Sequence, residues 1–233
     1  MNSDATVQYK QEAARRAVEF VTSGIILGLG YGSTAAFAVQ DVGEKIQAGE
    51  LRNIIAILSS VEMEPEARRL SIPLTTLDEH PFIDLTIDGA DEVDPTLNLI
   101  KGGGGALLRE KIVAQATRRE IIIVDESKLS SRLGTHKPVP VEVVPFGWKS
   151  QLAFLESLGA RVTPRKDPRG AGPFLTDQKN FILDCDFGPI ADPAGLAERL
   201  SRRAGIVEHG IFLNLTSDLI VAGKDGVRHI TRK

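Results

Sequence analysis

One short stretch of the sequence combines a lysine, four consecutive glycines and a glutamate: IKGGGGALLREKI, residues 100–112. Glycine loses more backbone entropy on folding than any other residue, roughly 0.5–1 kcal/mol relative to alanine, so a run of glycines needs a physical reason. Glycines at a strand-to-helix junction let a ligand approach the backbone closely and expose amide N–H groups to it. Together with the ammonium group of Lys101, such amides can stabilise a developing oxyanion.

Glu110 lies on the helix that follows these glycines, which the sequence predicts from about residue 105 to residue 118. At helical spacing it shares one stripe with small and mostly apolar residues: Ala106, Val113, Ala114 and Thr117. A carboxylate that is partly buried on such a face becomes a stronger base, as proton transfer requires. The alternative is a Glu110 side chain that extends into solvent or pairs with a basic residue.

A second stretch, DLTIDGADEVDP at residues 84–95, carries five acidic side chains within eleven positions. It begins as an apolar strand, and the two-residue period of a strand puts Asp84, Thr86 and Asp88 on one face. Asp88 ends that strand, where open α/β sheets place the groups that contact ligands. The pattern therefore predicts Asp88 at the carboxyl edge of a sheet.

Gly89 lets the backbone turn sharply after this strand, so that Asp88 and Asp91 can converge on one pocket. Paired carboxylates can move protons between oxygens or bind sugar hydroxyls. The alternative is turn chemistry, because aspartates stabilise turns and cap helices. We favour the functional interpretation for Asp88, and turn chemistry for Asp94, which directly precedes Pro95.

The third stretch, GLGYGSTAA at residues 28–36, is a glycine-rich turn from a strand to a helix. Its backbone amides and the positive end of the helix dipole make it suited to an anion. The dinucleotide fingerprint fails, because Ser33 replaces its last glycine and the next strand ends in Ser59 and Ser60 without an acid. The P-loop fails because there is no lysine. What remains is a phosphate loop or, as the alternative, a tight turn with Ser33 as the helix N-cap.

The other candidates are less specific. Lys128, in the DESK segment after an apolar strand, is either a cation for a phosphate or a solvated turn lysine. The four histidines are scattered and lack the spacing of metal ligands, so no metal site is predicted: His80, His136, His209 and His229.

Short apolar strands alternate with helices over the first half of the chain. Helices are predicted at residues 10–22, 34–48, 64–70 and 105–118, and strands at 24–30, 54–58, 72–77, 82–88 and 120–125. Buried strands in this alternation are typical of an α/β fold with a Rossmann-like, mainly parallel sheet that is covered on both faces.

The pattern changes near residue 133. From there the order of elements reads β-α-β-β-α-β, which is the signature of a ferredoxin-like α+β domain. The last segment reads as two strands with a hairpin around Asp225-Gly226 that returns to the first domain. We therefore predict a large catalytic domain at residues 1–132 and 208–233, with a smaller ferredoxin-like domain inserted at 133–207.

Composition narrows the class of protein. The chain has 233 residues with a net charge of −3, which disfavours a nucleic-acid partner. No apolar run approaches the ~18 residues of a membrane span, so no membrane association is predicted. A single cysteine, Cys185, excludes an internal disulfide and fits a reducing compartment. The N-terminal segment has no apolar core of a secretory signal, and we expect the chain in the cytoplasm or in an organelle.

Taken together, the three stretches resemble ribose-5-phosphate isomerases of the A type. GLGYGSTAA, TIDGADEVDP, IKGGGGALLREKIVA and VDESK follow one another in that family's order and at its approximate spacing. The likeness extends from the N-terminal helix to the C-terminal hairpin. DGADE followed by KGGGG and REK is its specific part, whereas the glycine-rich turn alone is not specific.

The resemblance implies a role for each motif. Glu110 is the implied proton acceptor, and the implied sugar site comprises Asp88, Gly89, Ala90, Asp91, Lys101, Gly102, Gly103 and Gly104. The implied phosphate site comprises Tyr31, Gly32, Ser33, Thr34 and Lys128, and Lys10 stands where the family has a lysine that can reach the phosphate. Tyr31 departs from the threonine or serine expected in this loop. If a hydroxyl is required at that position, the phenol must supply it.

The implied reaction converts ribose 5-phosphate to ribulose 5-phosphate by moving a proton from C2 to C1 through a cis-enediolate. Glu110 would be the base, Asp88 would move a proton between O1 and O2, and Lys101 with the glycine amides would bind the enediolate oxygen. The lysine and the amides replace a Lewis acid, so no metal or cofactor is predicted. The family also implies a homodimer or homotetramer.

Three other functions are alternatives to isomerisation. A non-catalytic sugar-phosphate sensor would lack the base and usually carries a DNA-binding helix-turn-helix, and a coenzyme A transferase-like enzyme would use a glutamate covalently. A nicotinamide oxidoreductase is disfavoured by the failed dinucleotide fingerprint.

Overall fold

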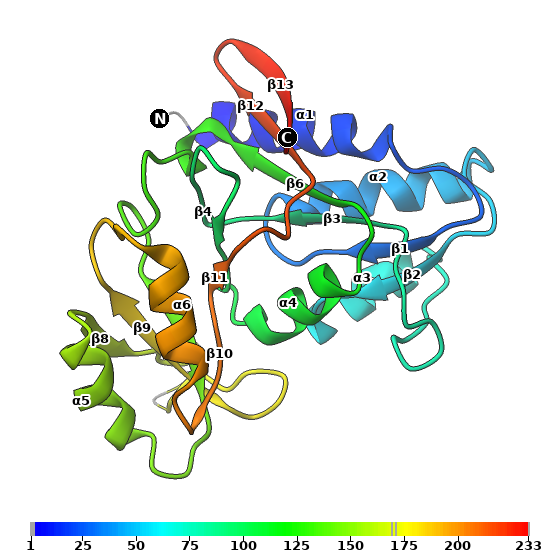
Figure 1. Cartoon of the computed structure of the whole chain (residues 1–233). Coiled ribbons are helices and arrows are strands. Elements are labelled where there is room, and N and C mark those ends of the chain that lie inside the picture. Colours follow the sequence, from blue (N-terminus) through cyan, green and yellow to red (C-terminus); the bar gives the residue numbers. More distant parts are fainter. Residues whose placement is uncertain (1–2, 169, 171, 233) are drawn as a thin grey trace. The chain divides into compact units, whose positions relative to one another are not determined.

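A computed structural model describes residues 3–168, 170 and 172–232 of the chain (Figure 1). The chain forms two compact units: the larger comprises Met1–Ala90, Arg109–Lys128 and Asn214–Lys233, and the smaller comprises Asp91–Leu108 and Leu129–Leu213. This division differs from the predicted domains, because residues 91–108, 129–132 and 208–213 belong to the smaller unit. Two short strands within 91–108 pair with each other and with a third strand at 211–212.

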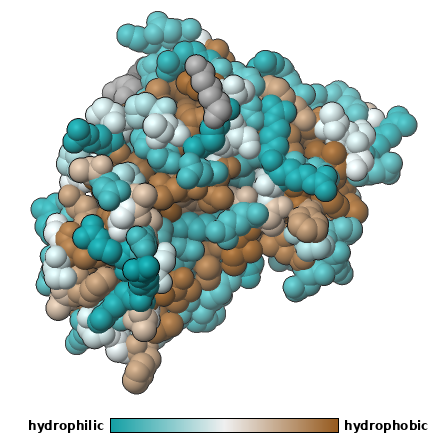
Figure 2. All heavy atoms as spheres, in the orientation of Figure 1, coloured by the Kyte–Doolittle hydropathy of each residue, from teal (hydrophilic) through white to brown (hydrophobic). Residues whose placement is uncertain are grey.

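None of the helices that the structure describes has both the length and the apolar character needed to cross a bilayer. On the face of the molecule drawn in Figure 2, hydrophilic and hydrophobic residues are interspersed.

The larger unit is built on a six-stranded sheet with the order β13-β12-β6-β3-β1-β2. Neighbouring strands are parallel except for β12 and β13, which form the predicted C-terminal hairpin. The predicted α/β fold is confirmed. The strands are β1 (Ile26–Leu29), β2 (Ile55–Leu58), β3 (Leu85–Gly89), β6 (Glu120–Asp125), β12 (Asp218–Gly223) and β13 (Gly226–Thr231).

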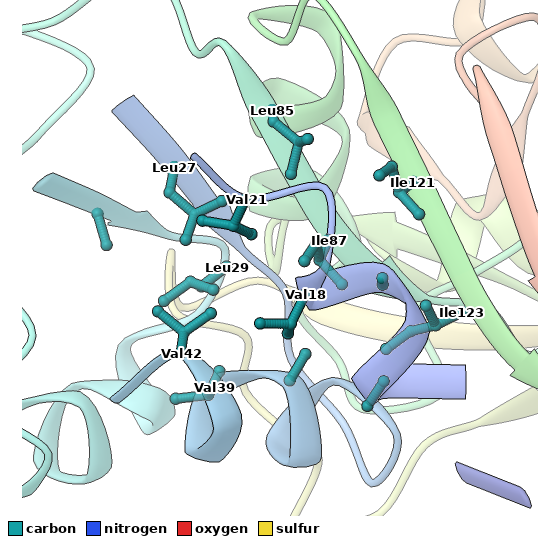
Figure 3. Close-up of a cluster of buried hydrophobic side chains, with 14 of the residues drawn as sticks. Val18, Val21, Leu27, Leu29, Val39, Val42, Leu85, Ile87, Ile121 and Ile123 are labelled. Atoms are coloured by element: carbon teal, nitrogen blue, oxygen red, sulfur yellow. The ribbon is translucent and has the colours of Figure 1, made fainter. Parts of the chain in front are cut away.

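Helices cover this sheet because its strands present apolar side chains to both faces. The helices are α1 (Ser3–Val18), α2 (Ala35–Gln47), α3 (Glu64–Arg69) and α4 (Leu107–Gln115). Figure 3 shows side chains of α1 and α2 packed on every second residue of three strands: Leu27 and Leu29, Leu85 and Ile87, Ile121 and Ile123. On the opposite face, Val113 of α4 packs against Ile57 and Ile83.

Two predicted elements of the larger unit are corrected. The first helix begins at Ser3, well before residue 10, and ends at Val18. The strand predicted at 72–77 is wrong: one parallel bridge joins Leu74 to Ala56. Pro73 offers only its carbonyl, which accepts from the amide of Ala56 at 2.7 Å, and a residue without an N–H cannot continue the ladder.

The smaller unit contains the predicted ferredoxin-like arrangement. Its sheet has the order β10-β7-β9-β8, and all neighbours are antiparallel. Alternate residues of β7 and β9 pack with Leu155, Leu196 and Leu200 of the helices, so the polar residues lie on the other face of the sheet. The elements are β7 (Val139–Val143), α5 (Lys149–Ser157), β8 (Arg161–Pro164), β9 (Phe181–Asp186), α6 (Pro193–Ser201) and β10 (Ile206–His209).

A small sheet of the same unit joins the acidic stretch to the glycine run. It contains β4 (Glu92–Val93), β5 (Leu99–Ile100) and β11 (Ile211–Phe212) in the order β11-β5-β4. The sequence did not predict these strands, because two residues are too few to show a period.

Glu142 is a buried acid on the polar face of β7. Its Oε1 accepts from Thr176 Oγ1 at 2.8 Å and from Asn180 Nδ2 at 2.9 Å. Burial raises the pKa of Glu142 above its ordinary value in spite of these two hydrogen bonds, and the charges of Asp177 and Glu208 add to the rise. Glu208 lies directly opposite Glu142 in the β7–β10 ladder. Ionised Glu142 is therefore a local cost to folding.

The Glu142→Gln variant should be more stable than the parent at neutral pH. When folding raises the pKa of a carboxyl group, its stabilising contribution is complete below the unfolded value, here 4.5, and is lost as the pH rises through the folded pKa. The amide stays neutral, so the advantage of the variant should grow towards neutrality and reach about 1 kcal/mol. Chemical denaturation at acidic and neutral pH measures it. Glu156→Gln, at an exposed position of α5, is the matched control and should show no such growth.

Candidate active site

The turn between β1 and α2 presents backbone amides at the start of a helix. Among the described residues, the N–H groups of Ser33, Thr34 and Ala35 donate to no backbone carbonyl, whereas that of Ala36 donates to Gly32 O at 2.9 Å. Thr34 is the N-cap residue, and its side chain makes no capping hydrogen bond. The alternative in which Ser33 caps the helix is therefore wrong. Unpaired amides at the positive end of a helix dipole suit an anion.

Helix α1 brings a positive charge to this turn. Lys10 Nζ donates to Ser33 Oγ at 2.9 Å. Tyr31, in contrast, donates its phenolic hydroxyl to the carboxylate of Glu62, and its ring packs against the apolar core of the unit. The phenol thus has a carboxylate partner, and Lys10 brings a cation to the turn.

Asp88 lies at the end of β3, against the backbone of the turn that follows the neighbouring strand β1. Its side chain is 1% exposed, and Oδ1 accepts from the amide of Gly89 at 2.7 Å. A Cβ atom at Gly30 would lie 2.0 Å from the same Oδ1, so only glycine leaves room for this carboxylate. Because β1 and β3 are adjacent and parallel, the amide turn and Asp88 occupy the same edge of the sheet, as predicted.

Glu110 faces inwards from α4. It is 5% exposed, and Val113 and Ala114 on the same stripe are also buried. The end of this helix is tied to β3, because Thr117 Oγ1 lies 2.7 Å from Thr86 Oγ1. The alternative of a solvent-exposed Glu110 is therefore wrong, and a buried carboxylate on a rigid helix is suited to act as a base.

Lys128 follows β6 in the short helix η2 (Glu126–Lys128) and is half-buried. Asp125, which is 1% exposed, shapes this turn by accepting from the amide of Ser127 at 3.0 Å. Since β6 is the parallel neighbour of β3, Lys128 projects from the same carboxyl edge of the sheet as Asp88.

In the smaller unit, Asp91 and the glycine run form a second carboxylate–backbone pair. The amide of Gly103 donates to Asp91 Oδ2 at 2.7 Å, and a Cβ at Gly103 would lie 2.6 Å from Oδ1. Gly102 and Gly105 have φ angles of +99° and +91°, which side chains disfavour. Lys101 is 2% exposed, and its Nζ lies 5.7 Å from the centre of the Phe212 ring. The run is therefore bent around Asp91.

Two other acids of the DGADEVD segment have structural roles. Glu92 is fully buried, and its carboxylate accepts from the backbone amides of residues 134–137 at 3.0–3.4 Å. Asp94 accepts from the amides of Thr96 and Asn98, which confirms turn chemistry at this position. No feature of the sequence singled out Glu92, because its partners lie more than forty residues away.

Among the described residues, no group of three or more histidines, cysteines or acids lies together as a set that could hold a metal ion.

Comparison with known proteins assigns the family. A family model described as Ribose 5-phosphate isomerase A (phosphoriboisomerase A) matches residues 55–226. The ribose-5-phosphate isomerase A of Desulfatibacillum aliphaticivorans is 57% identical over 221 residues, which are 95% of this chain and 96% of the relative. The chain belongs to the ribose 5-phosphate isomerase A family. The resemblance drawn from its motifs is thereby confirmed.

Solved structures of ribose 5-phosphate isomerases have the same fold. The enzyme from Plasmodium falciparum matches with a TM-score of 0.92 at 40% identity, over 97% of this chain and 99% of its own. A D-ribose-5-phosphate isomerase solved in complex with phospho-erythronic acid matches with a TM-score of 0.95 at 38% identity, over 100% of both chains. The stretch matched by the ribose 5-phosphate isomerase A model includes Asp88, Asp91, Lys101, Glu110 and Lys128.

Gly30→Ala should impair isomerisation because its Cβ would displace the carboxylate of Asp88. A displacement of about 1 Å at a reacting group can cost about 10²-fold in rate, and we expect a loss in kcat of that order. Steady-state kinetics measures it. Gly43→Ala is the matched control for overpacking, since its Cβ would meet Leu70 Cβ at 2.6 Å. Equal losses of kcat in both variants would mean that general overpacking of the unit, and not Asp88, causes the effect.

Proposed function

We propose that the chain interconverts D-ribose 5-phosphate and D-ribulose 5-phosphate by base-catalysed proton transfer through a cis-enediolate, a reaction of the non-oxidative pentose phosphate pathway. Family membership makes the chain an aldose–ketose isomerase. The observation that carries the proposed mechanism is the burial of Glu110 on α4, which supplies a carboxylate shielded from water.

Glu110 is the proposed base. In the forward direction its carboxylate removes the proton from C2 of the open-chain aldose, and the electron pair forms the C1–C2 double bond of the enediolate. The same carboxyl group then returns the proton to C1. Because the proton stays on one face of a planar intermediate, a single base suffices. General acid–base catalysis of this kind contributes about 10²–10⁴-fold.

The oxygens of the enediolate need their own partners. We assign the transfer of a proton between O1 and O2, and help with opening of the furanose ring, to Asp88. Asp91, with Gly89 and Ala90, completes the acidic side of the sugar site. Lys101 and the amides of Gly102, Gly103 and Gly104 are the proposed donors to the developing charge. One such preorganised donor contributes roughly 2.7–4 kcal/mol.

The phosphate is assigned to the turn before α2. The support for this assignment is the contact between Lys10 and Ser33 and the unpaired amides of the turn among the described residues. The phosphate lies at the far end of the sugar from the reaction, so its binding energy positions C1 and C2. The proposed phosphate site comprises Lys10, Tyr31, Gly32, Ser33, Thr34 and Lys128.

The cellular location, the oligomeric state and the cofactor requirement are also proposals. We propose a cytoplasmic enzyme that assembles as a homodimer or homotetramer and requires no cofactor. The support for the location is the single cysteine of the chain, which fits a reducing compartment.

Glu110→Gln should nearly abolish isomerisation while leaving ribose 5-phosphate binding intact. The amide keeps the shape and the burial of the side chain but cannot accept a proton, so we expect kcat to fall by about 10²–10⁴-fold. Conversion of ribose 5-phosphate to ribulose 5-phosphate and isothermal titration with the substrate provide the two readings. Turnover within about tenfold of the parent would remove Glu110 from the role of base.

Lys128→Ala should raise KM for ribose 5-phosphate with a smaller change in kcat. If the ammonium group contacts only the remote phosphate, it stabilises the bound substrate and the transition state equally. Loss of an interaction of this kind raises KM and leaves kcat nearly unchanged. The matched control is Lys224→Ala, at an exposed position of the β12–β13 turn. An unchanged KM in Lys128→Ala would reassign this lysine to the protein surface.

A further inference from the structure

Arg165, directly after β8 in the smaller unit, contacts the backbone of the glycine run. Its Nη1 donates to the carbonyl of Gly102 at 2.9 Å and to the carbonyl of Gly103 at 3.2 Å. The side chain is 15% exposed. No motif of the sequence pointed to this residue, which lies more than sixty positions from the glycines.

The guanidinium group is itself held in place on two sides. Asp184 on β9 accepts from Nε at 3.0 Å and also from Nη2, which is the two-pronged pairing that arginine makes with carboxylates. Phe174 lies with its ring centre 5.7 Å from the guanidinium carbon. The same ring fills the space over Gly105, where a Cβ would approach to 2.3 Å. The end of β8 and strand β9 thus hold a fixed cation against the glycine run.

The direction of a carbonyl decides the direction of the next amide. In a planar trans peptide the C=O and the following N–H point to opposite sides. The carbonyl of Gly102 points to Arg165, and the N–H of Gly103 accordingly points away and donates to Asp91 Oδ2 at 2.7 Å. By the same rule, the bond from Arg165 to the Gly103 carbonyl turns the N–H of Gly104 away from Arg165.

Glycine peptides need such a restraint more than others. Glycine adopts positive and negative φ with similar ease, so the orientation of a peptide between two glycines depends on its hydrogen bonds. The carbonyl of Gly102 accepts from Arg165 and also from the amide of Gly105 at 3.0 Å. A rotation of the peptide between Gly102 and Gly103 would withdraw the N–H from Asp91 and present a carbonyl in its place. That change would replace a donor by an acceptor where negative charge has to be stabilised.

We propose that Arg165, held by Asp184, is a positioning residue for the isomerisation: it fixes the peptides of the glycine run so that the amide of Gly103 keeps Asp91 in its orientation and the amide of Gly104 faces the reacting oxygens. Arg165 itself contacts no substrate. The inference rests on the proposed roles of Asp91 and of the glycine amides. Lysine cannot replace Arg165, because two carbonyls and a carboxylate require the planar fork of donors.

The test compares Arg165→Ala and Arg165→Lys with the parent in steady-state assays with ribose 5-phosphate. Amides that point the wrong way weaken the stabilisation of the transition state more than the binding of the substrate. We therefore expect kcat to fall by about 10²-fold while KM stays within about threefold. Arg165→Lys should recover little of the loss. Added guanidinium chloride at non-denaturing, millimolar concentration should restore part of kcat in Arg165→Ala and none in Glu110→Gln.

Arg161→Ala is the matched control. Arg161 pairs with Asp186 across the same two strands at 2.7 Å, but its side chain is 83% exposed, and we expect parent kinetics. If Arg165→Ala does not fold, Asp184→Asn keeps the guanidinium and loosens its support, and a selective fall in kcat is again expected.

Two results would overturn the inference. One is a kcat within about threefold of the parent in a folded Arg165→Ala or Asp184→Asn variant, and the other is a raised KM at unchanged kcat, which would make Arg165 a substrate-binding residue. A parent protein without isomerase activity would instead refute the proposed function, so the two failures are distinguishable.

Discussion

The close approach of a carboxylate to a glycine backbone is the constraint on which the proposed site depends. Two such pairs involve residues of the proposed site. Asp88 occupies the space that a side chain at Gly30 would fill, and Asp91 occupies that of Gly103. Each carboxylate is held against the backbone, so its position is determined by main-chain geometry and not by free rotation of its side chain. A side chain at either glycine would have to displace the carboxylate.

This constraint in turn depends on the packing of the sheet. In the parallel pairing of β1 and β3, Leu29 is opposite Ile87, and the residues that follow them along the chain are Gly30 and Asp88. Leu29 and Ile87 belong to the apolar core under α1 and α2 (Figure 3). A slip of one residue would move these side chains out of the core and turn Asp88 into it. Hydrophobic burial therefore fixes the register that places the carboxylate at the carboxyl edge.

The sequence was informative wherever residues close along the chain determine the outcome. The strand alternation that ends at Asp88 and the helical stripe of Glu110 both predicted the buried faces found in the structure. It was uninformative about partners brought together by folding. The amides around Glu92 and the bonds from Arg165 to the glycine carbonyls join distant segments, and the approach of Lys10 to the turn at Ser33 was expected only from the family resemblance. They involve no periodicity that one sequence can display.

The acidic stretch shows how packing separates chemistry from structure among similar side chains. Glu92 and Asp94 accept several backbone amides each, so protonating either would leave those donors with a weaker acceptor. The negative charges of Glu92 and Asp94 thus hold loops in place. Asp88 and Asp91 each accept from a glycine amide and lie against glycines that allow another molecule to approach the backbone. A carboxylate that must exchange a proton with a substrate during turnover belongs in the second situation, because the substrate can come close to it.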